Sequence, residues 1–271
     1  MYESYWQLGR KPFENGADPQ FYFPAETHQA ALLKLRYAVE NRRGGALLCG
    51  AAGTGKTLIV AMLREALGEI CSPFVHLVYP QMTPAELLAY LAEELDGMPS
   101  TTAAVHESIR RIQDALAENA KKGRHTVIVV DEAHLIENSQ MLETLRLLLN
   151  FGPDGKTGMT LILAGQPGIL PLLDRMPQLE ERLGVKCLLR PFTMQETGEY
   201  AAHRLNNAGA KRPIIAAEAV PTLHELTRGI ARQINRLCDL ALLVGFAEEQ
   251  HTLSAAHFEA VCRELVAVVP E

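Results

Sequence analysis

The run Gly50-Ala51-Ala52-Gly53-Thr54-Gly55-Lys56-Thr57 constrains the fold of this chain more than any other feature. It matches the pattern G-x-x-x-x-G-K-[ST], in which glycines let backbone N–H groups turn inward around a polyphosphate. The pattern requires a buried strand before the loop and a helix after it, because the helix N-terminus attracts the same anion. The apolar run 46–49 precedes the loop, and 57–67 has a helical pattern. The sequence therefore predicts a nucleotide-binding α/β domain.

Two side chains of this loop have specific expected roles. Lys56 is expected to reach the β- and γ-phosphates, and the Thr57 hydroxyl is expected to bind Mg²⁺. ATP and Mg²⁺ are therefore the expected ligands. We predict nucleotide contacts from the whole loop and from the residue that follows it, namely Gly50, Ala51, Ala52, Gly53, Thr54, Gly55, Lys56, Thr57 and Leu58.

An acidic pair, Asp131-Glu132, directly follows the apolar, β-branched run 126–130. A continuous run of this kind is typical of a strand whose two faces are both covered. Two carboxylates at its end form the Walker B arrangement, which predicts that Asp131 holds Mg²⁺ through its water shell and that Glu132 polarises the attacking water. A pair of acids at a helix N-terminus is the alternative. The phosphate loop upstream favours the catalytic interpretation, in which Asp131 also counts among the nucleotide-site residues.

The four residues Asp131-Glu132-Ala133-His134 also spell the DEAH motif of a helicase group. Those helicases need two motor domains, and the sequence after position 194 is too short and too helical to supply the second. The helicase interpretation is therefore rejected, and His134 is expected to be a local hydrogen-bonding residue.

Three more polar residues are candidates for the site, because phosphoryl transfer gains from a residue that senses the γ-phosphate and from a nearby arginine. Gln166 follows the predicted strand 159–163 and suits a sensor that orients the attacking water. Arg182 is the first candidate for an arginine finger given to a neighbouring copy, with Arg175 and Lys186 as rivals. Arg232, near the start of a later helix, is expected to couple that region to the nucleotide. The alternatives are a turn residue for Gln166, a solvated surface arginine for Arg182 and a helix-surface salt bridge for Arg232.

Strands and helices alternate along the first two thirds of the chain, which favours a parallel sheet with helices on both faces. From Met194 onward the pattern is only helical. The predicted fold class is α/β: a P-loop core with a parallel five-stranded sheet sandwiched by helices, plus a C-terminal all-helical lid. We place the nucleotide-binding domain at 1–193, including an irregular arm over 1–24, and the lid at 194–271. The strands are predicted at 46–49, 74–78, 126–130, 159–163 and 186–189, and the helices of the first domain at 26–42, 57–67, 84–96, 103–120 and 139–150.

Composition narrows the class of protein further. A formal charge of −6 and a sequence pI of about 5.9 are not those of a strongly basic nucleic-acid binder, although they do not exclude a local basic patch that binds DNA. Five cysteines without a C-x-x-C pair favour a reducing, cytoplasmic setting. No signal peptide and no long apolar run occur, so no direct membrane span is expected. Any association with an inner membrane is expected to come through partners.

Motifs distributed over nearly the whole chain resemble one family. They are Met1-Tyr2, Pro12-Phe13, Asp18-Pro19, Phe21-Tyr22, His28, Ala31-Leu32, Gly50–Thr57, Asp131–His134, Leu145–Phe151, Gly165-Gln166-Pro167, Glu196-Thr197, Tyr200, His203-Arg204-Leu205, Ala208-Gly209, Gly229-Ile230, Arg232, Ile234-Asn235 and Leu237-Cys238-Asp239. This combination resembles the general secretion pathway protein A (ExeA-like) group of AAA+ ATPases.

The resemblance implies an AAA+ core with a helical lid, assembly into a homo-oligomeric ring, expected to be a hexamer, and Mg-ATP hydrolysis between subunits. It implies that Lys56, Thr57, Asp131, Glu132, Gln166 and Arg232 keep the roles given above. Two positions depart from the family pattern: Ala231 stands where Pro is frequent, and Lys186 stands where Arg is frequent. The second departure favours Arg182 as the finger.

Three functions are compatible with these observations. The first is an AAA+ ATPase that assembles or remodels a protein complex, with the secretion or envelope machinery as the expected partner. The second is a DNA-associated regulator of the transposition type, for which lid charge would come from Arg204, Lys211, Arg212, Arg228, Arg232 and Arg236. The third is a nucleotide-gated switch or scaffold that hydrolyses ATP weakly. Secretion members of the family also carry a membrane span and a peptidoglycan-binding domain, which this sequence does not contain.

Overall fold

A computed structural model describes residues 1–99, 104–152 and 157–267, and the chain divides into two compact units. The sheet unit comprises Thr27–Ala51 and Ile59–Leu189. The helical unit comprises Met1–Glu26, Ala52–Leu58 and Arg190–Glu271. The chain therefore leaves the sheet unit for the short segment Ala52–Leu58 and returns to it within one helix.

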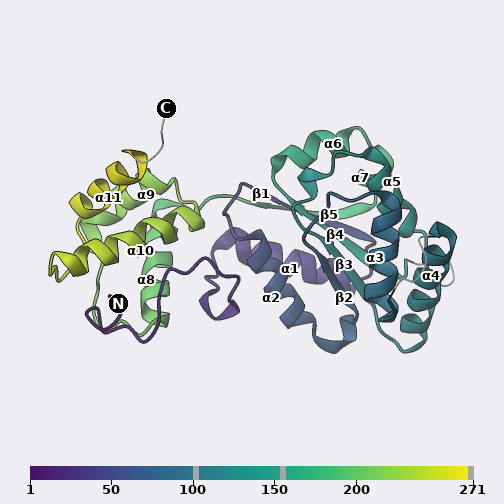
Figure 1. The fold of residues 1–271 in the computed structure, drawn as a ribbon, viewed down its shortest axis with the longest axis horizontal. Helices are drawn as coiled ribbons and strands as arrows, with labels where there is room; N and C mark the ends of the chain where they lie inside the picture. The colour runs from purple at the N-terminus through teal and green to yellow at the C-terminus, as the bar shows by residue number, and fades with distance from the viewer. Residues whose placement is uncertain (100–103, 153–156, 268–271) are drawn as a thin grey trace. The chain divides into compact units, whose positions relative to one another are not determined.

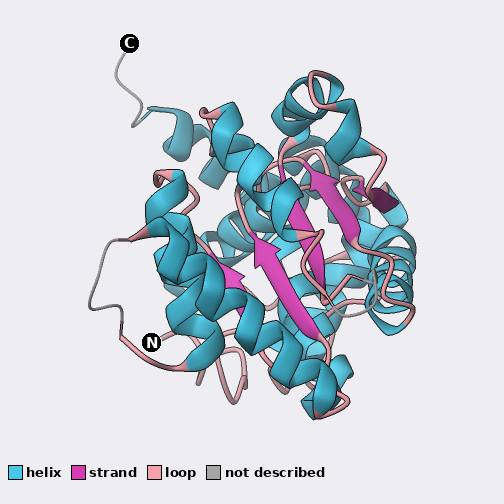
Figure 2. Cartoon of the chain, turned by 90° about the vertical axis from the view of Figure 1, so that its right-hand side faces the viewer, coloured by secondary structure: helices cyan, strands magenta, loops and turns pink. Residues whose placement is uncertain are grey.

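Five parallel strands form the sheet, as the sequence predicts (Figure 2). The strand order is β2-β3-β4-β1-β5. All residues of β1, β3 and β4 are buried, which explains why their sequences are mostly apolar. The strands are β1 (Gly45–Gly50), β2 (Phe74–Leu77), β3 (Thr126–Val130), β4 (Met159–Gly165) and β5 (Leu183–Leu189).

The register of the three central strands sets where the polar side chains lie. Val130, the last residue of β3, pairs with Leu163 of β4, and Cys49 of β1 pairs with Gly165 at the end of β4. Parallel strands present their carboxyl ends at one edge of a sheet. The residues after β3 and β4 therefore lie at the edge from which the chain leaves β1 at Gly50.

Helices cover both faces of the sheet (Figures 1 and 2). One face packs its apolar side chains, among them Leu47, Ile128 and Leu161, against α3, α4 and α5. A capping box starts α3, in which Thr83 and Glu86 each bond the other's backbone N–H. The helices of this unit are α1 (Glu26–Glu40), α2 (Lys56–Leu67), α3 (Pro84–Asp96), α4 (Val105–Lys121), α5 (Ser139–Leu148), α6 (Leu170–Asp174) and α7 (Pro177–Glu180), with α1 and α2 beginning in the helical unit.

The structure differs from the sequence prediction at a few element bounds. Strand β5 begins at Leu183, three residues before the predicted start, because it is an edge strand whose exposed residues break its apolar pattern. Helices α6 and α7 are too short to show a helical period and were not predicted. Residue 103, the predicted start of the helix before β3, lies outside the described residues, as do the last four residues of the predicted lid.

The helical unit packs its α-helices around an apolar core that includes Tyr200, Ile234 and Phe258. Its helices are α8 (Met194–Asn207), α9 (Val220–Thr227), α10 (Ala231–Ala247) and α11 (Ala255–Ala267). The short 3-10 helices η1 (Pro19–Phe21) and η6 (Ala217–Ala219) also lie in this unit, and η2 (Gly68–Cys71), η3 (Ala133–Leu135) and η5 (Pro167–Ile169) lie in the sheet unit. No helix in the described part of the chain is both long and apolar enough to cross a bilayer.

The N-terminal arm packs into the helical unit, whereas the sequence analysis grouped it with the nucleotide-binding domain. Trp6 is 1% exposed and its indole N–H donates to the Leu242 carbonyl oxygen, 2.9 Å away. The Tyr2 hydroxyl donates to Asp239, also on α10. Aromatic residues without a helical or strand period predict an irregular arm, but the pattern does not indicate the surface that the arm covers.

Candidate nucleotide and hydrolysis site

The phosphate loop has the backbone that its glycines allow. Gly53 and Gly55 adopt φ angles of 77° and 99°, in the region that favours glycine. Helix α2 begins at Lys56, so its N-terminus follows the loop directly. Thr54 and Lys56 are 2% and 5% exposed, respectively. A left-handed glycine turn that runs into a helix N-terminus fits a polyphosphate, because both features present backbone N–H groups to an anion.

Arg232 lies against this loop within the helical unit. Its backbone N–H donates to the Gly53 carbonyl oxygen at 3.1 Å. A Cβ atom added to Gly53 would stand 2.8 Å from the Arg232 Cβ atom and 3.1 Å from a methyl group of Ile230. The loop therefore needs glycine at this position for two reasons, its positive φ angle and the close approach of α10.

The acidic pair lies at the carboxyl end of β3 in the sheet unit. Asp131 is 1% exposed, its backbone N–H donates to the Leu77 carbonyl oxygen at 2.8 Å, and its Oδ1 atom accepts from the Glu132 N–H at 2.9 Å. Glu132 has φ 49° and ψ 34°, a left-handed conformation that costs a non-glycine residue about 1–3 kcal/mol. Its side chain is 37% exposed. The turn thus buries one carboxylate and leaves the next accessible.

Gln166 follows β4, and His134 lies between it and Glu132 of the acidic pair. The Gln166 backbone N–H donates to His134 Nδ1 at 3.3 Å, and the side-chain amide nitrogen lies 2.9 Å from His134 Nε2. The same Nδ1 atom is 3.4 Å from Oε2 of Glu132. The predicted base Glu132 and the predicted sensor Gln166 are therefore brought together, with an imidazole ring between them.

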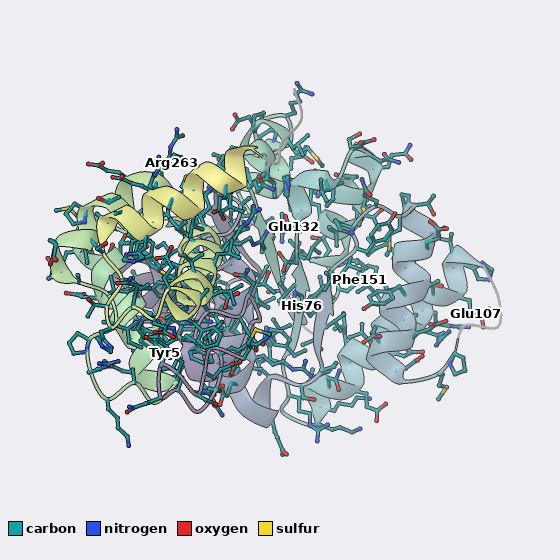
Figure 3. All side chains as sticks on the ribbon, turned by 60° about the vertical axis from the view of Figure 1, so that its left-hand side comes forward. Tyr5, His76, Glu107, Glu132, Phe151 and Arg263 are labelled. Carbon is teal, nitrogen blue, oxygen red and sulfur yellow. The ribbon has the colours of Figure 1, made fainter. Side chains whose placement is uncertain are left out.

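His76 is a residue of this cluster that the sequence analysis missed. It lies on β2, the neighbour of β3, and its Nε2 atom is 3.3 Å from Oδ2 of Asp131. His76 and Glu132, which lies in the turn after β3, are both labelled in Figure 3. The signal in the sequence is the single polar residue within the apolar run 74–78. It is weak, because it does not indicate which strand lies next to it.

The finger candidates lie elsewhere in the sheet unit. Arg182 precedes β5, whose first residue, Leu183, pairs with Gly45 at the start of β1. It therefore lies at the amino-terminal edge of the sheet, one strand length or about 20 Å from the edge that carries Glu132. The Arg182 guanidinium donates to the Asn150 side-chain oxygen at 3.1 Å, and the rival Lys186 pairs with Glu180 at 2.6 Å. Neither cation joins the Glu132 cluster within the sheet unit.

The two groups predicted to hold Mg²⁺ lie in different units, the Thr57 hydroxyl in the helical unit and the Asp131 carboxylate in the sheet unit. In the described residues, no group of three or more His, Cys, Asp or Glu side chains could hold a metal ion. Mg²⁺ keeps several water ligands and is bound through one or two protein groups together with phosphates. The Thr57 hydroxyl and the Asp131 carboxylate are groups of this kind.

Comparison with known sequences connects this site to a family. A sequence model described as "AAA domain" matches residues 39–173, which contain the phosphate loop, the acidic pair and Gln166. The chain is 34% identical over 256 residues to general secretion pathway protein A of Aeromonas hydrophila. The match covers 93% of this chain and 46% of that protein, so the chain spans less than half of the relative's length.

Solved structures show the same fold at low sequence identity. The Pyrobaculum aerophilum Cdc6p structure matches with a TM-score of 0.73 and 17% identity, over 96% of this chain and 74% of that chain. Drosophila ORC bound to DNA matches with a TM-score of 0.70 and 18% identity, over 96% and 66%. The Thermotoga maritima RuvB branch-migration motor matches with a TM-score of 0.60 and 19% identity, over 89% and 69%.

Proposed function

Because the chain belongs to the AAA+ ATPases of the general secretion pathway protein A type, we propose that it hydrolyses Mg-ATP to ADP and phosphate to assemble or remodel a protein complex. The observation that carries the proposal is the cluster of Glu132, His134 and Gln166 at the carboxyl ends of β3 and β4. The neighbouring β1 ends at this same edge and leads directly into the phosphate loop.

In the proposed mechanism, the loop amides and Lys56 bind the phosphates, and Thr57 and Asp131 would hold Mg²⁺. The metal would neutralise charge that develops on the phosphate oxygens. Glu132 polarises the attacking water and Gln166 orients it. Arg232, which contacts the loop through Gly53, connects α10 to the nucleotide.

Assembly into a ring completes the proposed site. Arg182 lies about one strand length from Glu132, at the opposite edge of the sheet, so it could serve only the site of a neighbouring copy. An arginine finger supplied by a neighbouring copy raises kcat by a factor of about 10³–10⁵. We propose a homo-oligomer, with a hexamer as the expected size, in which each copy supplies Arg182 to the next.

The similarity to general secretion pathway protein A suggests the partner. We propose that the complex acted upon belongs to the secretion or envelope machinery, and that a cytoplasmic protein reaches the inner membrane through it. This chain matches 46% of that protein. We therefore propose only which complex is acted upon, and we assign no contact within that complex.

The test is the ATPase rate measured against protein concentration. The proposal expects specific activity to rise as copies associate and to fall for Arg182→Ala, because the finger acts between copies. Glu132→Gln should bind ATP normally and stop turnover, and Lys56→Ala should lose ATP binding. Turnover of Glu132→Gln at the parent rate would refute the catalytic assignment. ATP binding by the parent without turnover at any concentration would identify a nucleotide-gated switch instead.

A DNA-associated function is the second candidate, and charge on the helical unit favours it. Lys211, Arg212, Arg228 and Arg236 are exposed, whereas Arg204, counted in the predicted lid charge, is 3% exposed and leaves that set. The similar Drosophila ORC structure is described as bound to DNA. Affinity for duplex DNA that requires ATP and falls with salt would support this function. No binding at low salt would exclude it.

A further inference from the structure

The ring of His134 lies between Glu132, which is proposed to polarise the attacking water, and Gln166, which is proposed to orient it. Its side chain is 13% exposed, and it lies in the 3-10 helix Ala133–Leu135 directly after Glu132. Gly165 makes this approach possible, since a Cβ atom there would stand 3.1 Å from the His134 backbone nitrogen and 3.6 Å from ring Nδ1. The end of β4 is thus shaped to hold the imidazole against Gln166.

The two ring nitrogens have partners that cannot all be satisfied by one protonation state. A neutral imidazole has one N–H donor and one acceptor nitrogen. Nδ1 faces a donor, the Gln166 backbone N–H at 3.3 Å, and also an acceptor, Oε2 of Glu132 at 3.4 Å. Nε2 faces the Gln166 side-chain amide at 2.9 Å. The partner that Nδ1 selects therefore fixes the role of Nε2.

Each tautomer presents a different end of the Gln166 amide to its surroundings. When Nδ1 accepts from the backbone N–H of Gln166, Nε2 carries the proton and the amide oxygen must face the ring. The amide NH₂ group is then free to donate. When Nδ1–H donates to Glu132, Nε2 accepts from the amide NH₂ group, and the amide oxygen is free to accept a hydrogen bond from water.

We propose that His134 is a positioning residue that couples Glu132 to Gln166, its tautomer selecting which end of the Gln166 amide is turned toward the nucleotide and the attacking water. This inference rests on the proposed ATPase function. It assigns no proton transfer to His134, which responds to Glu132 and acts through Gln166.

The kinetic test compares His134→Ala with His106→Ala, which removes an exposed histidine of α4 in the same unit. We expect His134→Ala to lower kcat about tenfold or more with little change in the KM for ATP, because binding is left intact. His134→Gln keeps one donor and one acceptor and should recover part of kcat. His106→Ala should match the parent.

A double-mutant cycle separates positioning from general structural damage. If His134 acts through Gln166, then His134→Ala in a Gln166→Ala background should lower kcat no further. Additive losses in the two variants, or parent kcat in His134→Ala, would overturn the inference. A parent protein without ATPase activity would instead refute the proposed function, so the two failures are distinguishable.

NMR of the His134 ring gives a measurement that does not depend on the folding of His134→Ala. The ¹⁵N signals of His134, assigned by their loss in His134→Gln, report which nitrogen carries the proton. Replacing Glu132 by Ala leaves Nδ1 facing only the Gln166 N–H, so the Nε2–H tautomer should predominate. Ring signals that do not respond to Glu132→Ala would contradict the coupling.

Discussion

The backbone N–H of Arg232 donates to the carbonyl oxygen of Gly53, 3.1 Å away, so the first turn of α10 rests on the phosphate loop. The contact leaves no room for a side chain on Gly53, whose Cβ would meet the Arg232 Cβ at 2.8 Å. A loop that is proposed to bind ATP and a helix that is proposed to respond to ATP therefore share one backbone hydrogen bond.

Replacing Gly53 by Ala should separate these two elements and weaken nucleotide binding about tenfold or more. The variant combines the cost of a positive φ angle, about 1 kcal/mol, with the clash against α10. Gly68→Ala is the matched control, since Gly68 has φ 58° but nothing within 4 Å of its added Cβ. Titration of a fluorescent ATP analogue measures both variants. Equal affinities in the two would show that contact with Arg232 is irrelevant to the loop.

Arg204 should hold the N-terminal arm on the helical unit. It is 3% exposed, donates to the carbonyl oxygens of Pro12 and Glu14 at 2.5 and 2.7 Å, and stacks its guanidinium 4.2 Å from the Phe21 ring centroid. Arg204→Met keeps an apolar stem but leaves two carbonyls without their donor, at a cost of about 1–3 kcal/mol. Arg204→Lys should rescue little, because one ammonium cannot reproduce the planar fork.

The measurement for Arg204 uses Trp6, the one tryptophan of the chain, which is buried in the arm. Urea unfolding followed by Trp6 emission should shift to lower urea in Arg204→Met, and proteolysis within residues 1–24 should accelerate. Arg212→Met, at an exposed position on the same unit, is the control. Parent-like proteolysis of the arm in Arg204→Met would contradict this account.

The strands of the sheet that are covered on both faces were predictable from the sequence. Thr126–Val130 is predicted to the residue, because a strand covered on both faces is apolar throughout. Edge strand β5 was predicted short at its start, because the exposed Gly184 interrupts its apolar residues. Gln166 lies near the end of β3 because β3 and β4 are parallel neighbours, and the sequence pattern does not specify which strands are neighbours.

The contacts of the histidines were not predictable from the sequence. His76 and Asp131 are separated by 55 positions, and only strand pairing brings them to 3.3 Å. A local hydrogen-bonding role is expected for His134 from the sequence, but its partner Gln166 lies 32 positions away. Side-chain partners of this kind depend on register and rotamer, which a single sequence does not encode as a readable pattern.

Acid should weaken the start of α8 through Glu196. Burial alone would raise the pKa of Glu196, but hydrogen bonds from Arg190 and from the Thr193 backbone N–H outweigh it and lower the pKa to about 2. A carboxylate with a depressed pKa stabilises the fold fully above its unfolded pKa of about 4.3. That stability, about 1–3 kcal/mol, is lost as the pH falls from there toward 2.

Trp6 emission should therefore report a lower unfolding midpoint for Glu196→Gln than for the parent at pH 6, with the difference shrinking toward pH 2. Glu86→Gln, which alters the corresponding capping box of the exposed helix start at α3, is the control and should leave the Trp6 transition unchanged. A difference between Glu196→Gln and the parent that stays constant from pH 6 to pH 2 would refute the electrostatic origin.

His125 should make the sheet unit acid-sensitive in a higher pH range. It is 4% exposed, its Nε2 atom lies 2.8 Å from the Thr160 hydroxyl oxygen, and burial together with the nearby charge of Arg42 lowers its pKa from 6.5 to about 4. At a pH between these two values, the ring is therefore neutral in the folded chain and protonated in the unfolded chain. Unfolding takes up a proton between these two pKa values, so stability falls as pH drops from about 6.5 to about 4, by at most about 1.4 kcal/mol per pH unit.

Hydrogen exchange of peptides from β3 and β4 measures this effect in the sheet unit alone. Protection should decrease in the parent between pH 6.5 and pH 4 after correction for intrinsic exchange rates. His125→Gln can still bond Thr160 but does not titrate, so its protection should be nearly constant over that range. His106→Gln changes an exposed histidine of the same unit and should keep the parent slope. A slope in His125→Gln equal to that of the parent would assign the acid sensitivity to another group.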